Sequence, residues 1–448
     1  MFKELTEFRF EIGCKEIAMM FEMLHPADQI VTLMNRIYDH DMTTALGVNL
    51  SVRDAQGTVW ISPGGVDKGN LRREDIMQIK PDGTICGIYR PSAEYPFHLA
   101  IYKKRPDIKA VLHAHPPTVI ACSLLHKTPN TALFFDTRKM IETVSSVSYE
   151  IPGSSALGDK LSSEFAEGTK AVLLERHGVV IGDVTLYQAF QAFEALVLCA
   201  DTERNASIID GKVCGLSLED IRNFSQINEQ KMEEFVPTEH FGEELLARRE
   251  LCSFIKRAYE KRFIASGSGV FSCKLSDGSF LITPENKDRQ DIRPEELVWI
   301  QNGKRESGKN PSRTVAFHQA VYAKNSSVNS MIEARPSSVI AYAVTDKALD
   351  LRLLPEMYIA LRDVKKYPFG MSFTNPEALA DAITGKNPTA MIMNDCVIAT
   401  GVSLLKAFDK LEMLEYSAKA LIEASAFGEE PKGLDAESFK ELERAFNL

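Results

Sequence analysis

Two histidines stand two residues apart at the end of an apolar run, in the stretch Ala110-Val-Leu-His-Ala-His-Pro-Pro117. In an extended strand, residues i and i+2 point to the same face, so His113 and His115 can converge on one point. The prolines that follow cannot donate to a strand ladder but suit the first turn of a helix, which we expect at Thr118–Leu125. Paired imidazoles at a strand end are typical of half a metal site, unless backbone carbonyls simply satisfy both rings.

Two more side chains have suitable donor atoms. His177 follows the predicted strand Ala171–Leu174 and precedes a glycine, so its ring can lie where the backbone turns away. Glu94 falls in the first turn of a predicted helix with Ser92 as its N-cap, although the helix dipole alone also favours a carboxylate there. Zn²⁺ is held by imidazole nitrogens and carboxylate oxygens, and a catalytic site keeps one position open. The candidate ligands are His113, His115, His177 and Glu94.

The elements that must position these side chains alternate between strand and helix periods. A hairpin is predicted at Val48–Asp54 and Thr58–Ser62, followed by the loop Pro63-Gly64-Gly65. Residues 1–45 are mostly helical in pattern, and Leu186–Ala200 predicts a long amphipathic helix.

The second half of the chain repeats the first. The pattern Pro91-Ser-x₄-Phe-His-x-Ala-x-Tyr102 returns at Pro311–Tyr322, a shift of 220 residues, and Ala189-Phe190 returns as Ala407-Phe408. Between the repeats, residues 201–245 are polar and acidic, with one predicted helix at Leu218–Phe224. Matches at a nearly constant offset indicate tandem copies of one domain. We expect domains at 1–240 and 241–448.

Comparison of the two repeats also separates residues that the fold requires from residues that the chemistry requires. His98 is kept as His318, which predicts a structural role for His98. The four candidate ligands are all lost together: His113 becomes Glu333, His115 becomes Arg335, Glu94 becomes Thr314, and His177 falls opposite Asp395. One shared metal ion explains a coordinated loss, whereas independent packing roles do not.

These residues belong to a set of motifs that resembles the class II aldolase/adducin family, of the L-fuculose-phosphate aldolase type, over roughly residues 25–205. The motifs are Asn49-x-Ser51-x-Arg53, Ser62-Pro63-x-Gly65, Pro91-Ser92-x-Glu94, His98-x₃-Tyr102, Arg105-Pro106-Asp107, His113-x-His115-Pro116 and His177-Gly178.

The resemblance implies a fold and a set of roles. Each domain would be an α/β fold with a central, mostly antiparallel sheet flanked by helices, and the second would be a degenerate copy. His113, His115 and His177 would bind zinc, or another divalent transition metal, and Glu94 would be the general base that also touches the metal. A substrate phosphate would rest on the loops that carry Asn49, Gly64, Gly65 and Ser92.

The activity implied is that of a metal-dependent lyase acting on a small sugar phosphate or a related hydroxy-carbonyl compound. Retro-aldol cleavage must stabilise an enediolate, and Zn²⁺ does so as a Lewis acid while a carboxylate moves the proton. Gly64 and Ala93 stand where hydroxyl residues often hold the phosphate. A substrate with a different anionic group in place of the phosphate is therefore an alternative. Alternatives are a decarboxylase, dehydratase or epimerase of the family, or a non-catalytic adducin-like binding module, which would lack the histidine set.

The second half is expected to be inactive for a further reason. Glu285 and Asn286 replace Gly64 and Gly65, and Phe271 is expected opposite the position of Asn49. A carboxylate in the anion loop would repel a phosphate by roughly 1 kcal/mol even when well solvated.

Composition limits the partners and the compartment. The formal net charge of −10 argues against binding to nucleic acid or an anionic membrane. We find neither an apolar stretch of membrane-spanning length nor the basic-then-apolar start of a signal peptide. The 8 cysteines form no CxxC pair and are expected to be buried free thiols, which favours the cytoplasm.

Assembly can also be predicted from the resemblance. The family's enzymes form fourfold rings with each site at a subunit boundary. Two tandem chains supply four domains, so we expect a homodimer or higher homo-oligomer that imitates such a ring.

Overall fold

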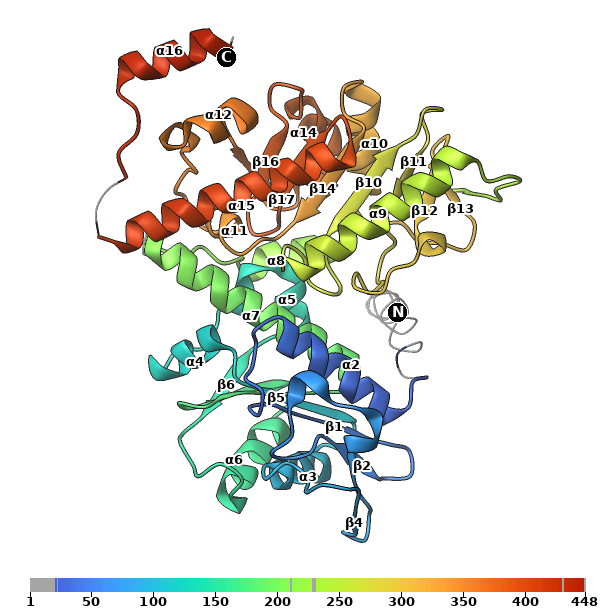
Figure 1. Ribbon diagram of the computed structural model, residues 1–448, viewed down its shortest axis with the longest axis vertical. Helices are drawn as coiled ribbons and strands as arrows, with labels where there is room; N and C mark the ends of the chain where they lie inside the picture. Colours follow the sequence, from blue (N-terminus) through green and yellow to red (C-terminus); the bar gives the residue numbers. More distant parts are fainter. Residues whose placement is uncertain (1–20, 22, 210–211, 228–230, 429–430, 447–448) are drawn as a thin grey trace. The chain divides into compact units, whose positions relative to one another are not determined.

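The computed structural model describes residues 21, 23–209, 212–227, 231–428 and 431–446 (Figure 1). The chain divides into two compact units at Ala200–Asp201, except that Leu133–Phe135 cluster with the second unit. Of the mostly helical stretch predicted over residues 1–45, residues 1–20 and 22 lie outside the described residues. The predicted domain limits, 1–240 and 241–448, remain a prediction.

The first unit is built on an 8-stranded sheet in the order β4-β3-β2-β1-β5-β8-β7-β6. All neighbours in this sheet are antiparallel except β6 and β7, which confirms the mostly antiparallel α/β fold. The hairpin predicted before Pro63 is present as β1 and β2. The strands are β1 (Asn49–Arg53), β2 (Val59–Ile61), β3 (Met77–Ile79), β4 (Ile85–Cys86), β5 (Ala110–Ala114), β6 (Val144–Val147), β7 (Ala171–Leu174) and β8 (Gly178–Asp183).

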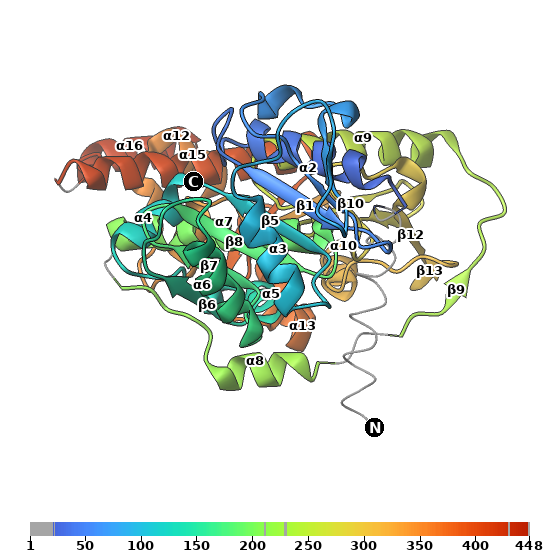
Figure 2. The ribbon, with the colours of Figure 1, turned by 90° about the horizontal axis from the view of Figure 1, so that it is seen from below.

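Helices cover both faces of this sheet, and the strand period decides which side chain meets which helices. In β5, Ala110, Leu112 and Ala114 pack in the core under α2 and α7, whereas Val111 packs in the core under α3 and α6. Helices α3 and α6 lie side by side on their face (Figure 2). The helices are α2 (Pro26–Asp39), α3 (Tyr95–Lys104), α4 (Pro117–Leu124), α5 (Phe135–Ile141), α6 (Ser155–Ala166) and α7 (Leu186–Ile209).

The start of α3 differs from the prediction. Glu94, not Ser92, is the N-cap residue, and the helix begins at Tyr95. The Ser92 hydroxyl accepts a hydrogen bond from the Glu94 backbone N–H at 3.3 Å, so it closes a turn before the helix instead of capping it. The Glu94 carboxylate makes no capping bond and is free to point elsewhere.

The second unit repeats this sheet with one more strand, in the order β15-β16-β17-β14-β10-β11-β12-β13-β9. Helices α9 and α15 lie over one face of it (Figure 1), and α10 and α14 contribute to the core on the other. Its strands are β9 (Glu234–Phe235), β10 (Val270–Lys274), β11 (Phe280–Ile282), β12 (Val298–Gln301), β13 (Lys304–Glu306), β14 (Ser330–Ala334), β15 (Lys365–Tyr367), β16 (Thr389–Ile392) and β17 (Cys396–Gly401). Its helices are α8 (Leu218–Ser225), α9 (Gly242–Glu260), α10 (Val315–Lys324), α11 (Val339–Ala343), α12 (Pro355–Leu361), α13 (Met371–Thr374), α14 (Pro376–Ala382), α15 (Leu404–Ala426) and α16 (Ala436–Phe446).

Strand register corrects one predicted equivalence. Asn49 pairs across the ladder with His113, and Val270 pairs with Glu333 in the same way. The counterpart of Asn49 is therefore Val270, and the assignment of Phe271 was wrong by one residue. A one-residue error in a strand moves the side chain to the other face.

Two findings bear on the compartment prediction without deciding it. Within the described residues, no helix combines the length and the low polarity needed to cross a bilayer. No disulfide joins the described cysteines, of which Cys199 and Cys396 are buried and the others half-buried.

A buried ion-pair network yields a stability prediction for the second unit. The Arg248 guanidinium, 4% exposed, donates to Glu244, to Glu306 Oε2 at 2.9 Å and to the Leu297 carbonyl at 2.6 Å. Arg248→Ala would leave two carboxylates without their shared cation, so we expect a loss of about 3–5 kcal/mol in the free energy of unfolding. Urea denaturation of the full chain measures this, with Arg249→Ala on the exposed side of α9 as the matched control. Equal unfolding curves for the two variants would contradict the network's importance.

Candidate metal centre

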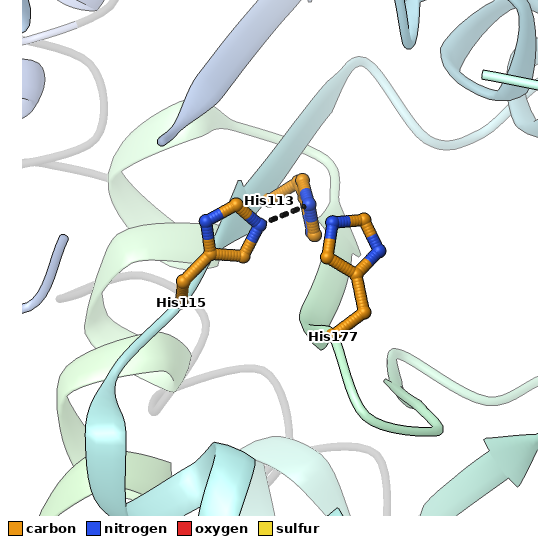
Figure 3. A group of neighbouring side chains, drawn as sticks. All are labelled: His113, His115 and His177. Carbon is orange, nitrogen blue, oxygen red and sulfur yellow. Dashed lines mark hydrogen bonds between the residues drawn. The ribbon is translucent and has the colours of Figure 1, made fainter. Parts of the chain in front are cut away.

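Three histidines converge from two neighbouring strands. His113 lies in β5 opposite Val180 of β8, His115 follows β5, and His177 immediately precedes β8. The Nε2 atoms of His113 and His115 are 2.8 Å apart, and one ring nitrogen from each of the three lies within 4.8 Å of the others (Figure 3). Ligand atoms of a tetrahedral zinc site are separated by roughly 3.4 Å, since Zn–N bonds are about 2.0–2.1 Å long. The rings are therefore within reach of one ion.

A backbone contact determines which nitrogen of His113 faces the cluster. The ring is fully buried, and its Nδ1 lies 2.9 Å from the Val179 carbonyl oxygen. Because a carbonyl can only accept, Nδ1 carries the hydrogen and Nε2 keeps its lone pair toward the other rings. Such a bond to the distal nitrogen is the usual way in which a metal-binding histidine is oriented.

The other two imidazoles are held neutral. Burial, followed by the proximity of His113 and His177, lowers the pKa of His115 to about 3. Burial also lowers the pKa of His177, with a further contribution from His113. Neutral imidazole is the form that binds a metal ion, so both rings are ready to do so at neutral pH.

Glu94 completes the cluster from the start of α3. Its Oε2 lies 3.3 Å from His113 Nε2 and accepts a hydrogen bond from Asn49 Nδ2 at 2.8 Å. Its Oε1 lies 3.7 Å from His177 Nε2 and is buried without a hydrogen-bond partner. Burial opposes its ionisation, but the imidazoles and the Asn49 amide outweigh this and hold the carboxyl pKa well below its usual range.

These observations test whether a metal fits. A buried, ionised carboxylate oxygen without a hydrogen-bond donor is costly unless a cation satisfies it, and ring nitrogens of three histidines stand beside this one. The donor set of nitrogen and oxygen atoms suits zinc and related divalent transition metals. The histidine triad is thus consistent with a divalent metal site.

A chain of buried hydrogen bonds fixes the orientation of Asn49, the residue that donates to Glu94. His98 Nε2 is 2.5 Å from Asn49 Oδ1, and His98 Nδ1 is 2.7 Å from Ser51 Oγ, which in turn is 2.7 Å from Tyr102 Oη. The Asn49 carbonyl can only accept from His98, so its NH₂ group must face Glu94. Burial lowers the pKa of His98 to about 3, which keeps the ring neutral.

These hydrogen bonds agree with a structural role for His98. In the second unit, Ser272 makes the same two contacts, with His318 Nδ1 and with Tyr322 Oη. Sequence reasoning did not connect the chain to Glu94, although Asn49, Ser51, His98 and Tyr102 all stand in the motifs quoted above.

The predicted anion loop lies beside the start of α3. An isolated bridge joins Pro63 to Pro91, and a Cβ at Gly64 would come within 3.2 Å of the Pro91 carbonyl oxygen. Gly65 has a φ of +68°, which favours glycine. The Gly64 N–H is already bonded to the Arg90 carbonyl at 2.9 Å, and Asn49 is engaged by Glu94 and His98. The anion-binding role of Asn49, Gly64, Gly65 and Ser92 stays a prediction.

The side chains at the corresponding positions of the second unit form hydrogen bonds and an ion pair with one another or with neighbouring residues. Glu333 accepts from Thr314 Oγ1 at 3.1 Å and lies 3.0 Å from His318 Nε2. Arg335 forms an ion pair of 3.0 Å with Asp395. Among the residues that the structure describes, the only group of three or more potential ligands that converges in this way is the triad of the first unit.

Gly178 offers a test of how tightly the triad is held. A Cβ there would lie 2.5 Å from the Ala114 carbonyl oxygen and 2.7 Å from His115 Cδ2, so something must shift. We expect Gly178→Ala to weaken metal binding by about 10–100-fold, as disturbed ligand orientation usually does. Competition with a chromogenic chelator measures the affinity.

The matched control is Gly158→Ala in α6, where an added Cβ makes only ordinary contacts of 3.6–3.8 Å. Unchanged affinity in Gly178→Ala would mean that His115 is not positioned as we describe.

The fold and this cluster together define a class of protein. The sequence matches the family described as "Class II Aldolase and Adducin N-terminal domain" over residues 28–203 and again over 249–422, and the chain belongs to that family. Both predicted repeats are thereby confirmed as members of it.

Particular relatives are enzymes that act on sugar phosphates. One is the 3-oxo-tetronate 4-phosphate decarboxylase of Haemophilus influenzae, 34% identical over 37% of this chain and 81% of the relative. Another is the 5-deoxy-D-ribulose 1-phosphate aldolase of Bacillus thuringiensis, 31% identical over 39% of this chain and 81% of the relative. A solved structure of an L-fuculose 1-phosphate aldolase is 26% identical, with a TM-score of 0.41 over 45% of this chain and 94% of that one.

Proposed function

We propose that the first unit is a metal-dependent lyase, with zinc as the first candidate ion, that cleaves a small sugar phosphate between two carbons in a retro-aldol reaction. The observation that carries this proposal is the unpaired, buried Oε1 of Glu94 beside His113, His115 and His177. Family membership supports the same class of chemistry, since the relatives include an aldolase and a decarboxylase.

Each residue has a distinct task in this proposal. His113, His115 and His177 hold the ion, which when bound supplies Lewis-acid polarisation of the substrate carbonyl. Glu94 is ionised, so in the cleavage direction it takes up the proton of the hydroxyl group on the carbon that departs as the aldehyde and returns it to the carbon next to the carbonyl. Asn49 keeps the carboxylate oriented through its 2.8 Å hydrogen bond, and His98 fixes Asn49.

The substrate phosphate would lie on the loop that carries Gly64 and Gly65 and on the backbone around Ser92. A helix begins there, so its N-terminal N–H groups and dipole favour an anion. Because Gly64 and Ala93 provide no hydroxyl groups, backbone donors would supply most of the contacts.

We further propose that the second unit is a degenerate, non-catalytic copy. Its Glu333 and Arg335 are used in contacts with Thr314, His318 and Asp395, and Glu285 replaces the glycine at the anion loop. By the same family logic we expect a homodimer or higher homo-oligomer in the cytoplasm. Light scattering that shows a fully active monomer would overturn the assembly.

One relative favours a second candidate reaction, decarboxylation of a 3-oxo acid phosphate. It needs the same polarised carbonyl but releases CO₂ instead of an aldehyde. Dehydration and epimerisation are further family alternatives. A non-catalytic adducin-like module is the alternative of another class, and the intact triad argues against it.

The experiment is a substrate panel with the metal-loaded full chain. L-fuculose 1-phosphate, 5-deoxyribulose 1-phosphate, methylthioribulose 1-phosphate and 3-oxo-tetronate 4-phosphate are incubated and the products are followed by NMR. We expect dihydroxyacetone phosphate and an aldehyde from a ketose 1-phosphate, and no product after chelation. Release of CO₂ alone would replace the aldolase by the decarboxylase, and no turnover of any member would favour the binding module.

A further inference from the structure

The second unit contains a cavity of ≈ 430 Å³ between α10 and the pair α13–α14. Its volume is that of a typical small-molecule site. Ala316 and Ala320 form part of the α10 wall, and Ser372 and Phe373 face them from α13. None of these residues belongs to the positions that correspond to the candidate metal centre.

The cavity coincides with a difference between the two repeats. In the first unit, α6 is one continuous helix that packs along α3, with Gly158 facing Phe97. In the second unit, the stretch between β15 and β16 forms two short helices, α13 and α14, which are separated at Asn375-Pro376. Helix α14 packs against α10 as α6 packs against α3, and the cavity lies beside α10 where α13 ends and α14 begins.

Two polar groups at this cavity lack hydrogen-bond partners. Arg313 Nε is buried and unbonded, and no carboxylate of the described residues forms an ion pair with this guanidinium. Ser372 is only 2% exposed, and its hydroxyl oxygen also has no partner. Buried donors left unpaired are costly, so a ligand that accepts from both gains affinity.

The position and charge of Arg313 point to the sign of that ligand. Its guanidinium carbon lies 5.4 Å from the Phe224 ring centroid and 5.1 Å from that of Phe373, so two aromatic rings hold it in place. The carboxylate at the cavity, Glu377, is 66% exposed and pairs with Lys324 at 2.9 Å, and Lys324 also pairs with Asp381 at 2.8 Å. Among the described residues that line the cavity, Arg313 is the one cation, and its buried, unbonded Nε favours an anionic ligand.

The arginine is specific to this repeat. Arg313 follows Pro311-Ser312, and the first repeat has Ala93 after Pro91-Ser92. A cavity and a cation thus appear together in the unit whose metal ligands are replaced.

We propose that this cavity is a binding site for a small organic anion. The carboxylate or phosphate group of the ligand accepts hydrogen bonds from Arg313 and from the Ser372 hydroxyl, and its apolar part lies against Phe373 and the alanines of α10. The planar guanidinium suits either oxyanion, because its donors match both geometries. The inference does not depend on the catalytic activity proposed for the first unit.

Isothermal titration calorimetry of the full chain tests the site with benzoate and phenyl phosphate as probes and neutral benzamide as the control. We expect at least one anion to bind at millimolar concentration or below, and benzamide not to bind. The stronger probe tells a carboxylate ligand from a phosphate ligand. Arg313→Met, which keeps the volume and removes the charge, should weaken binding by about tenfold or more.

Two further variants make the result decisive. Ser372→Ala should bind the anion more weakly while its melting temperature stays equal or rises, because it removes an unpaired buried hydroxyl. His115→Ala should retain binding, since its change lies in the other unit. The proposal is overturned if neither anion binds, if benzamide binds equally well, or if Arg313→Met binds as tightly as the unchanged chain.

Discussion

Glu94→Gln is expected to retain the bound metal and to lower kcat by about 10²–10⁴-fold, the usual contribution of a positioned acid–base group. Glutamine keeps the shape of the side chain, and its amide oxygen can still accept the 2.8 Å hydrogen bond from Asn49 Nδ2. The amide cannot take up a proton at neutral pH, so the step at the substrate carbon loses its base. Steady-state kinetics with the best substrate of the panel, together with metal analysis, measures both quantities.

The second repeat supplies the matched control. Glu333→Gln changes a carboxylate that is 3.0 Å from His318 but stands in the unit without the triad, so kcat should stay the same. If Glu94→Gln turns over substrate at the unchanged rate, Glu94 is not the proton carrier. If Glu333→Gln slows turnover as much, the second unit takes part in catalysis and our assignment of roles fails.

His115→Ala is expected to abolish stoichiometric metal binding and, with it, activity. Loss of a ligand should weaken affinity by more than the roughly 10–100-fold typical of losing only a supporting contact. The folded first unit should persist, because His115 lies after the end of β5 and is only half-buried. Added metal should raise the melting temperature of the unchanged chain but not of the variant, since an ion stabilises only the form that binds it.

The control for this variant is His126→Ala, which changes a histidine of the same unit whose side chain is 70% exposed. It should bind metal normally. Equal metal content in His115→Ala and the unchanged chain would exclude the triad as the site.

Much of the site could be predicted, because the positions of its histidines follow from the two-residue repeat of a strand and from a turn marked by glycine. His113 and His115 share a face through the two-residue repeat of a strand, and their convergence follows once β5 is recognised. The turn that places His177 beside them is marked by Gly178 in the sequence. The tandem architecture could also be predicted from the sequence, because matching residues of the two repeats are separated by a nearly constant number of positions.

What could not be predicted depends on register and on backbone groups. The hydrogen bond from His113 Nδ1 goes to the backbone carbonyl of Val179, so no residue type in β8 predicts it. The contact between Asn49 and Glu94 requires knowing which residues of β1 and β5 stand opposite each other. The misplaced Phe271 is the same difficulty, because it assumes an offset of 222 from Asn49, whereas the paired strands keep the offset of 221 seen at Ser51 and Ser272.

The cavity beside α10 was equally out of reach. It exists because α13 and α14 replace one helix, and a break at Asn375-Pro376 predicts an end of a helix without predicting the empty space next to it. The unpaired Arg313 and Ser372 become meaningful only when their surroundings are known.

The metal content of the purified full chain tests the central claim most directly. Elemental analysis after loading with zinc and removal of loosely bound ions should give one equivalent per chain, and His115→Ala should give none. Two equivalents per chain would show that the second unit also holds an ion, and none in the unchanged chain would contradict a metal-dependent activity at His113, His115 and His177.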